Sequence, residues 1–362
     1  MVNRRQKSQN LPAGIALLFV MLLTLSADAR ASEVNLLAMG DWGSNAPDQR
    51  AVAATMKSYL QRTGRKFDAM LLAGDNFYVL LENIFDPKWR SMFEDLYDPS
   101  VFDFPFYPVM GNHDYRNTNF LIELAYSKSN PRSRWKFPAR WYRVDLPARP
   151  PDAAAADDAE PLVTVIMLDS DMPVVGDVEW KRELDWLKKE LAKPRAAKWL
   201  VCVAHHPLFS NGDHGDNGIL QRTWGPLFEK AGVDFYICGH DHDVQHLELG
   251  PRYPSFLMVG GGGATTRPMR IDRRGPFSKS THGFAHLSFA ADLATVRLIG
   301  ADNARAEGGT ILHEFTRTHD KRVTVARSLP SDVAIPRTVK SITRENNFEP
   351  LAATPPATQR LK

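Results

Sequence analysis

Two histidines separated by one residue follow an apolar run near the middle of the chain. The run at residues 233–238 has the composition of a buried strand, and the loop directly after it carries His240 and His242. Neutral imidazole is a favoured ligand of zinc, iron and copper. Alternate side chains on a turning backbone can be aimed at one ion or at two neighbouring ions. The pair therefore indicates a candidate metal site at the end of a strand.

The same arrangement, an apolar run followed by a turn and a potential metal ligand, occurs at four earlier positions. The runs at residues 34–39, 67–72, 104–110 and 199–204 are each expected to form a buried strand. The loops after them and the segment beyond carry carboxylate, phenol, amide and imidazole groups, namely Asp41, Asp75, Tyr78, Asn112, His113, His205, His206 and His214. Because the carboxyl ends of strands meet at one edge of an α/β sheet, we expect these side chains to converge.

The mixture of side-chain types favours a centre with two metal ions. Carboxylates suit hard cations and imidazoles suit borderline ones, whereas a phenol near neutral pH needs a strongly acidifying ion such as ferric iron to lose its proton. More ligands are present than one ion can bind, so two ions bridged by a carboxylate are the simplest arrangement. Two ions a few Å apart can generate hydroxide and stabilise both oxygens of a displacement at phosphorus.

The order of the other expected elements indicates an α/β chain. Helices are expected at 46–62 and 177–193, and further strands at 141–146, 162–168, 255–259, 284–289, 294–299 and 310–315. Residues 147–161 are rich in Ala, Pro and Asp and are expected to form an exposed insertion. The four glycines at 260–263 would allow the backbone to approach a site closely.

The five loops together closely resemble the motif blocks of the calcineurin-like metallophosphoesterases. Trp42 in the first block and Tyr78 in the second narrow the resemblance to the purple acid phosphatases of the small, tartrate-resistant type. The resemblance covers residues 34–315. It implies an α/β four-layer sandwich, in which two central mixed β-sheets are flanked by helices, within a single catalytic domain at residues 32–315.

The resemblance also implies a role for each candidate ligand. In the family pattern Asp41, Tyr78 and His242 bind Fe(III) and Asp75 bridges the two ions. The divalent partner, which in the family is iron, zinc or manganese, is bound by the remaining three ligands, Asn112, His205 and His240. His205 is chosen over His206 because it holds the family position two residues before the proline. The mammalian members have a tyrosine where this chain has His206, so the role of His206 stays open.

The activity implied by the resemblance is that of an acid phosphatase acting on small phosphate esters. A metal-bound hydroxide would attack phosphomonoesters, while His113 and His214, if protonated, would stabilise the phosphoryl oxygens and protonate the leaving alcohol. Activity should then fall as the pH rises. Two alternatives remain: a related metallophosphodiesterase, and a metal- or phosphate-binding protein with little turnover.

The first 31 residues have the order of parts of a secretory signal peptide. Basic residues precede an apolar run at 15–25 that is short for a membrane span, and small residues follow it. We therefore expect a periplasmic or secreted monomer without stable membrane insertion after cleavage. Removing residues 1–31 takes away four basic residues and one acidic residue, which lowers the net charge from +3 to zero.

The ends of the chain and the cysteines set the remaining expectations. Residues 316–362 carry nine basic and four acidic side chains and are expected to form a basic, Pro-rich extension, which leaves the body acidic. An acidic body without a basic run interleaved with aromatic residues excludes a nucleic-acid partner. Cys202 and Cys238 occupy equivalent places in two apolar strands. An exported chain would allow them to pair, but their placement favours two buried thiols.

Overall fold

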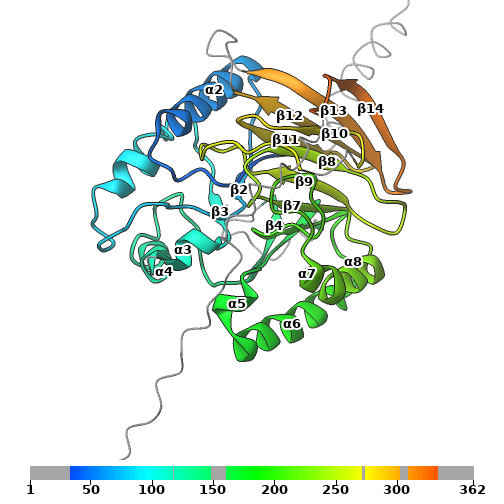
Figure 1. Cartoon of the computed structure of the whole chain (residues 1–362), viewed down its shortest axis with the longest axis horizontal. Helices are drawn as coiled ribbons and strands as arrows, with labels where there is room; N and C mark the ends of the chain where they lie inside the picture. Colours follow the sequence, from blue (N-terminus) through cyan, green and yellow to red (C-terminus); the bar gives the residue numbers. More distant parts are fainter. Residues whose placement is uncertain (1–32, 117, 148–159, 271–273, 302–308, 333–362) are drawn as a thin grey trace, which may run out of the picture.

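The two central β-sheets contain seven strands each (Figure 1). The computed structural model describes residues 33–116, 118–147, 160–270, 274–301 and 309–332. The expected signal peptide at 1–31, most of the insertion at 147–161 and most of the C-terminal extension lie outside the described residues. Among the described residues, none of the helices is long and apolar enough to cross a membrane.

Sheet A has the order β14-β13-β12-β11-β1-β2-β3. Strands β1, β2 and β3 run parallel, and the other four continue the sheet antiparallel from β1. The strands of sheet A are β1 (Val34–Met39), β2 (Ala69–Leu72), β3 (Phe106–Pro108), β11 (Gly283–Phe289), β12 (Leu293–Gly300), β13 (Thr310–Thr318) and β14 (Val323–Ser328).

Sheet B has the order β10-β8-β9-β7-β6-β5-β4. Its four central strands β9, β7, β6 and β5 are parallel, and β4, β8 and β10 pair antiparallel at the two sides. The strands of sheet B are β4 (Tyr142–Leu146), β5 (Val163–Met167), β6 (Trp199–Val203), β7 (Phe235–Cys238), β8 (Val244–Leu247), β9 (Ser255–Val259) and β10 (Phe277–Lys279). Both sheets are thus mixed, as the family resemblance implies.

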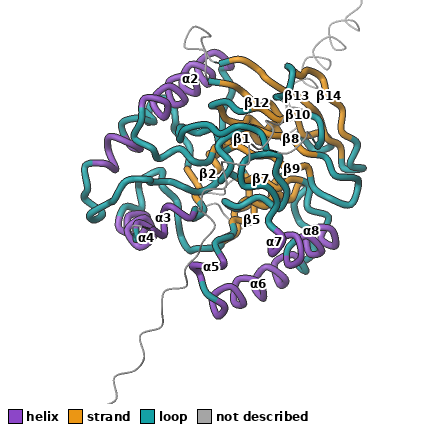
Figure 2. Tube along the Cα trace, viewed as in Figure 1, coloured by secondary structure: helices purple, strands orange, loops and turns teal. Residues whose placement is uncertain are grey.

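The helices lie at the outside of the molecule, with the strands between them (Figure 2). Helix α2 (Pro47–Thr63) covers sheet A, and α6 (Asp177–Leu191), α7 (Gly218–Thr223) and α8 (Gly225–Ala231) cover sheet B. The shorter elements are the π-helix η1 (Arg90–Glu94), α3 (Asn112–Arg116), α4 (Asn119–Ser129) and α5 (Met172–Val175). The α/β class and the two mixed sheets with outer helices are confirmed.

Alternate residues of the central strands enter two different apolar cores. In β6, Val201 and Val203 face the core between the sheets, whereas Cys202 belongs to the core under the outer helices. In β7, Cys238 also faces the helices. Both faces of these strands are covered, so their sequences are continuous runs of apolar residues and not an alternation of apolar and polar residues. Cys202 and Cys238 are buried free thiols, as the sequence favours.

The ordered sheet continues beyond residue 315, where the sequence analysis places the end of the domain. Strand β13 runs to Thr318, and β14 pairs with it through residues Val323–Ser328. In the described part of the chain, sheet A thus extends past the expected boundary at 315. The sequence gives little sign of β14 because nearly all its residues are exposed at the edge of the sheet, so no apolar alternation marks it.

Candidate functional site

The candidate ligands follow the carboxyl ends of strands in both sheets. Asp41, Asp75 and Asn112 come after β1, β2 and β3 of sheet A, while the remaining three, His205, His240 and His242, come after β6 and β7 of sheet B. Because the two sheets face one another, these loops meet at a common end of the sandwich. Asp41, Asp75 and His205 are almost completely buried there.

The first group consists of Asp41, Tyr78 and His242. The Tyr78 hydroxyl lies 3.1 Å from Asp41 Oδ1 and 3.1 Å from His242 Nε2. His242 Nε2 is 3.4 Å from the same carboxylate oxygen. Asp41, Asp75 and His242 offer ligand atoms that all lie within 4.8 Å of one another. A carboxylate, a phenol and an imidazole therefore meet at one point, with the Asp75 carboxylate next to them.

The second group consists of Asn112, His205 and His240. Asn112 Oδ1 lies 3.1 Å from His205 Nε2 and 3.1 Å from His240 Nδ1, and these two ring nitrogens are 3.2 Å apart. Asp75 connects the groups, because its Oδ1 is 3.5 Å from His205 Nε2. The structure thus brings together all seven residues that the sequence predicts as ligands.

The hydrogen bonds of two imidazoles fit a site for a pair of cations. Each cation would be bound through the lone pair of a ring nitrogen. His205 Nδ1 lies 2.9 Å from the carbonyl oxygen of Ala73, and His242 Nδ1 lies 2.7 Å from that of Thr265. A carbonyl only accepts hydrogen bonds, so both Nδ1 atoms carry a proton, and when the rings are neutral both Nε2 atoms present lone pairs to a cation. His205 Nε2 then faces another acceptor, Asn112 Oδ1, an arrangement that a cation between them would stabilise.

Burial and neighbouring charges set the ionisation of the first group. Burial opposes ionisation of Asp41, but hydrogen bonding to His242 and the charge of His205 hold the pKa of Asp41 below its ordinary value. Burial, followed by the charges of Asp41 and Asp75, raises the pKa of the Tyr78 phenol well above its ordinary value. In the metal-free site Tyr78 is therefore a neutral phenol.

Backbone geometry around Asp75 explains why the third block begins with glycine. A Cβ atom at Gly111 would lie 2.2 Å from Asp75 Oδ1, which no side chain could accommodate. The same oxygen accepts a hydrogen bond of 2.8 Å from the backbone amide of His113. Close approach of the Gly111 backbone thus fixes the orientation of the Asp75 carboxylate.

The two outer histidines pack against different ligand groups. The His113 ring packs on Tyr78 with ring centroids 4.3 Å apart, and the His214 ring stacks on His240 at 4.0 Å. Burial lowers the pKa of both outer histidines. The guanidinium of Arg267 donates to His214 Nε2, so in this arrangement that nitrogen accepts a hydrogen bond instead of carrying a proton.

His206 lies beside the second group, and its ring centroid is 4.3 Å from that of His240. Its Nδ1 is 2.9 Å from the Ser170 hydroxyl, which also accepts a hydrogen bond of 2.8 Å from the His206 amide. The imidazole nitrogens of His205, His206 and His240 lie within 4.8 Å of one another. Geometry alone thus leaves His206 close enough to take part in the site.

A cavity of about 750 Å³ opens over both ligand groups. Its wall combines the ligands and outer histidines with two arginines and with apolar side chains of α5 and α7. The lining includes Asn112, His113, Arg116, Met172, Val174, His206, His214, Ile219, Leu220, His240, His242 and Arg267. A small organic phosphate can therefore reach the ligand groups.

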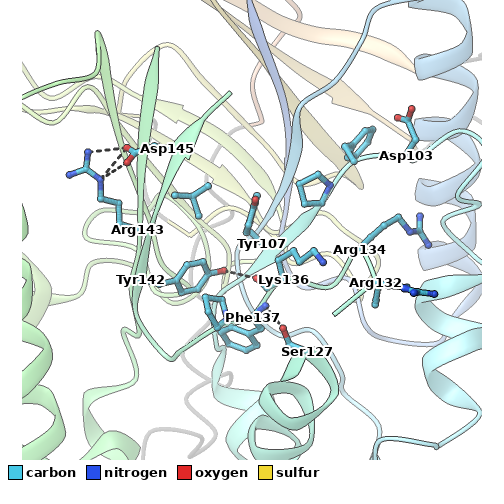
Figure 3. Close-up of a pocket in the computed structure, with 15 residues that line it drawn as sticks. Asp103, Tyr107, Ser127, Arg132, Arg134, Lys136, Phe137, Tyr142, Arg143 and Asp145 are labelled. Carbon is cyan, nitrogen blue, oxygen red and sulfur yellow. Dashed lines mark hydrogen bonds and ion pairs between the residues drawn. The ribbon is translucent and has the colours of Figure 1, made fainter. Parts of the chain in front are cut away.

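A second large cavity, of about 640 Å³, lies between the edges of the sheets near β3 and β4 (Figure 3). Two of its three arginines are already engaged, since Arg143 pairs with Asp145 and Arg134 pairs with Glu94. Among the described residues, both potential metal-binding groups of His, Cys, Asp or Glu lie at the first cavity. The first cavity is therefore the candidate site.

Two residues at the site were missed in the sequence analysis. The buried Asp114 carboxylate accepts hydrogen bonds from the backbone amides of Asn76, Phe77 and Gly111, and so joins the second and third blocks. Its position directly after His113 was the available signal. Arg267, which lines the cavity, comes four residues after the glycines at 260–263, and this glycine run was its available signal.

With this geometry in place, comparison with known proteins defines the class. Residues 34–244 match the model of the family described as calcineurin-like phosphoesterase. The chain therefore belongs to the calcineurin-like phosphoesterases. Family, fold and the convergent Asp and His groups together make it a metal-dependent phosphoesterase.

Individual relatives place it more closely. Tartrate-resistant acid phosphatase type 5 of Homo sapiens is 30% identical over 308 residues, which cover 79% of this chain and 93% of the human protein. The Rattus norvegicus protein of the same name is 32% identical over 281 residues, which cover 71% of this chain and 81% of the rat protein. Purple acid phosphatase 3 of Arabidopsis thaliana is 27% identical over 302 residues, which cover 79% of this chain and 78% of the plant protein. The predicted resemblance to purple acid phosphatases is thus confirmed.

Solved structures support the fold. The purple acid phosphatase PPD1 of Lupinus luteus aligns with a TM-score of 0.60 and 16% identity over 86% of this chain and 58% of its own. GAP50, described as the anchor in the inner membrane complex of Plasmodium, aligns with a TM-score of 0.65 and 19% identity. The alignment covers 82% of this chain and 90% of GAP50. At these identities the likeness concerns the fold alone.

Proposed function

We propose that the protein is a binuclear-metal acid phosphatase that hydrolyses phosphomonoesters. The observation that carries this proposal is that two ligand groups, connected by Asp75, face one cavity that also contains His113 and His214. A single ion could not use all of these donors at once. The acid phosphatase relatives support the same reaction class.

We propose Fe(III) for the group that contains Tyr78, and a divalent iron, zinc or manganese ion for the group that contains Asn112. The phenol favours the more acidifying ion, and the neutral imidazoles and amide favour the borderline one. When bound, such a pair lowers the pKa of a water molecule and neutralises charge on the phosphate.

The chain's own residues then bind and orient the ester. His113 is anchored through its backbone amide to Asp75, so its ring is held over the Tyr78 side of the cavity. His214 is anchored through its amide to Asp241 Oδ1 at 2.8 Å and covers the His240 side. We propose that these two rings contact the phosphoryl oxygens and that one of them passes a proton to the leaving alcohol.

The test is metal analysis alongside hydrolysis of one monoester and one diester. Purified protein should contain two metal ions per chain and should hydrolyse 4-nitrophenyl phosphate faster at pH 5 than at pH 8. Asn112→Ala should lower the metal content and the rate together. A fully active protein without bound metal would contradict the proposal.

A metallophosphodiesterase is the second candidate, since a cavity of about 750 Å³ has room for two ester groups. The two functions differ in the ratio of kcat/KM for 4-nitrophenyl phosphate and for bis(4-nitrophenyl) phosphate. A ratio well above one supports the monoesterase, and a ratio well below one supports the diesterase.

We also propose that the protein is exported and acts as a monomer in the periplasm or outside the cell. The support is the signal-peptide pattern of residues 1–31. Cell fractionation should recover the activity outside the cytoplasm, with an N-terminus near residue 32. A cytoplasmic, uncleaved chain would contradict the proposal.

A further inference from the structure

The loop that carries Arg267 is fixed directly to the ligand groups. The Ala264 amide donates a 2.8 Å hydrogen bond to the Asp41 carbonyl, and the Arg267 amide donates a 3.2 Å hydrogen bond to the His242 carbonyl. The Thr265 carbonyl accepts the bond from His242 Nδ1 at 2.7 Å. Arg267 is therefore held in place by two of the proposed ligands.

The charge of Arg267 has no anionic partner among the described residues. Its guanidinium donates to His214 Nε2, and no carboxylate of the described chain forms an ion pair with it. Three residues further on, Arg270 shows the contrast, because it pairs with Asp213. Arg267 thus carries a positive charge that no hydrogen-bonded carboxylate of the described chain balances, although it acts on the Asp241 and Asp243 carboxylates at longer range.

This charge lies where an ester would contact both ligand groups. The backbone amide of Arg267 is hydrogen-bonded to the carbonyl of His242 in the first group, and its guanidinium is hydrogen-bonded to His214, which stacks on His240 of the second group. Its side chain lines the main cavity and also a neighbouring cavity of about 320 Å³ beside Tyr78 and His242. Arg267 thus lies at the boundary between the phosphate position and the space next to it.

We propose that Arg267 determines substrate class by binding the free oxygens of a dianionic phosphomonoester and disfavouring diesters. The proposal rests on the proposed phosphatase function. A monoester offers three unesterified oxygens and two negative charges, and a planar guanidinium matches two such oxygens at once. A diester has one charge fewer and places a second alcohol group on one of these oxygens. The same guanidinium therefore stabilises it less.

The experiment compares Arg267→Met with wild type as metal-loaded full-length protein. Methionine keeps an unbranched side chain of similar length but removes the charge. The kcat/KM for 4-nitrophenyl phosphate should fall by about tenfold to a hundredfold, as for loss of a charge-assisted contact. The kcat/KM for bis(4-nitrophenyl) phosphate should change by less than about threefold, since the diester loses little charge attraction. Arg267→Lys should retain part of the preference.

Arg252→Met is the matched control, because Arg252 is an exposed arginine paired with Glu229 away from the cavity. It should leave both kcat/KM values unchanged. Metal content must remain two per chain in all variants. If Arg267→Met lowers both values equally, or changes neither, the assignment of Arg267 is overturned.

Calorimetric binding of inorganic phosphate and of dimethyl phosphate tests Arg267 without turnover. Wild type should prefer inorganic phosphate, and Arg267→Met should reduce that preference by about tenfold, in line with the loss of one charge-assisted contact. An unchanged preference overturns the inference. Wild type that binds phosphate through Arg267 but hydrolyses neither ester would contradict the phosphatase function alone.

Discussion

Three of the proposed ligand-bearing loops depend on backbone conformations that side chains rarely adopt. Asp41, Asp75 and His240 have φ values of 56°, 50° and 70° without being glycine. Such conformations cost on the order of 1 kcal/mol each and persist where surrounding contacts hold them. Here the Asp41 carboxylate accepts the His240 amide at 2.8 Å. The residue types and their spacing were enough to predict that these side chains converge, but the strained turns that orient them leave no sequence pattern of their own.

The choice between His205 and His206 can be tested by metal content. Both imidazoles lie near His240, but only His205 has its Nδ1 proton fixed by a backbone carbonyl and its Nε2 directed at Asn112. His205→Ala should therefore lower bound metal from two ions towards one per chain. His206→Ala should keep two ions. Elemental analysis of the two purified variants decides, and loss of metal only in His206→Ala would reverse the assignment.

Tyr78→Phe tests the identity of the ion in the first group. The oxidised, iron-loaded protein should be violet through phenolate-to-iron charge transfer, and the variant should lose that absorption. Phenylalanine keeps the ring that packs on His113, so the fold should be retained. Visible absorption and iron content are measured together. A variant that keeps the violet band would rule out Tyr78 as the iron ligand.

At the scale of the element, the strands with both faces covered are the easiest to recognise in the sequence, although β4, β12 and β13, whose faces are partly exposed, are predicted as well. The runs that became β1, β5, β6, β7 and β9 are unbroken apolar segments because both faces are buried. Strands β8 and β10 were missed for a different reason than β14. Strand β8 directly follows the histidine loop and is only four residues long, with Gln245 and His246 in a buried polar network, and β10 has only three residues. Sequence periodicity cannot mark such short or polar strands.

Strand β11 contains a buried histidine that should make the fold sensitive to acid. His286 Nδ1 lies 2.7 Å from the Tyr59 hydroxyl of α2 and its Nε2 lies 3.0 Å from Asn35 Oδ1 of β1. Burial, with smaller contributions from Arg297 and Arg65, lowers the pKa of His286 to about 3. The ring is therefore neutral in the folded protein, whereas in the unfolded chain it takes up a proton below its ordinary pKa of about 6.5.

His286 should therefore cost stability between pH 6.5 and pH 3. The stabilisation from the neutral, buried His286 is fully present above pH 6.5. It is lost progressively as the pH falls towards the folded-state pKa, and at pH 5 about 2 kcal/mol of the free energy of unfolding has been lost. In His286→Gln the free energy of unfolding should drop less between pH 7 and pH 5, by about that amount. Urea denaturation at both pH values measures this. His319→Gln, which removes an exposed histidine, should keep the wild-type difference.

At the scale of the whole molecule, the last strand of sheet A sets where the chain can be shortened. Asp332 accepts hydrogen bonds from Lys279 Nζ at 3.0 Å and from the Ser280 amide at 2.8 Å, which ties the end of β14 to β10. A chain that ends at Asp332 should melt as the full chain does. A chain that ends at Arg322 lacks β14, exposes the edge of β13 and should melt lower and self-associate. Calorimetry and gel filtration distinguish the two, and equal behaviour would show that β14 adds no stability.

The site itself belongs to both sheets, which was the hardest property to foresee. Convergence of the loops followed from the rule for the carboxyl ends of strands, but that rule concerns one sheet. In the structure, Asn112 comes from sheet A, and the His205 and His240 that contact it come from sheet B. Which strands share a sheet is decided by long-range packing of the two cores, about which local sequence says little.

Since both sheets contribute ligands, bound metal should hold the molecule together. Without metal, the buried Asp41 and Asp75 carboxylates lie close to one another and their charge is only partly balanced by the histidines. Each site filled at a thousandfold excess over its dissociation constant adds about 4 kcal/mol. At about 2 °C per kcal/mol for a large domain, removing both ions should lower the melting temperature by on the order of 15 °C. Calorimetry of the protein before chelation, after chelation and after metal is restored measures the effect. A chelated protein that has lost its metal and its activity but melts unchanged would show that the sheets hold together without the ions.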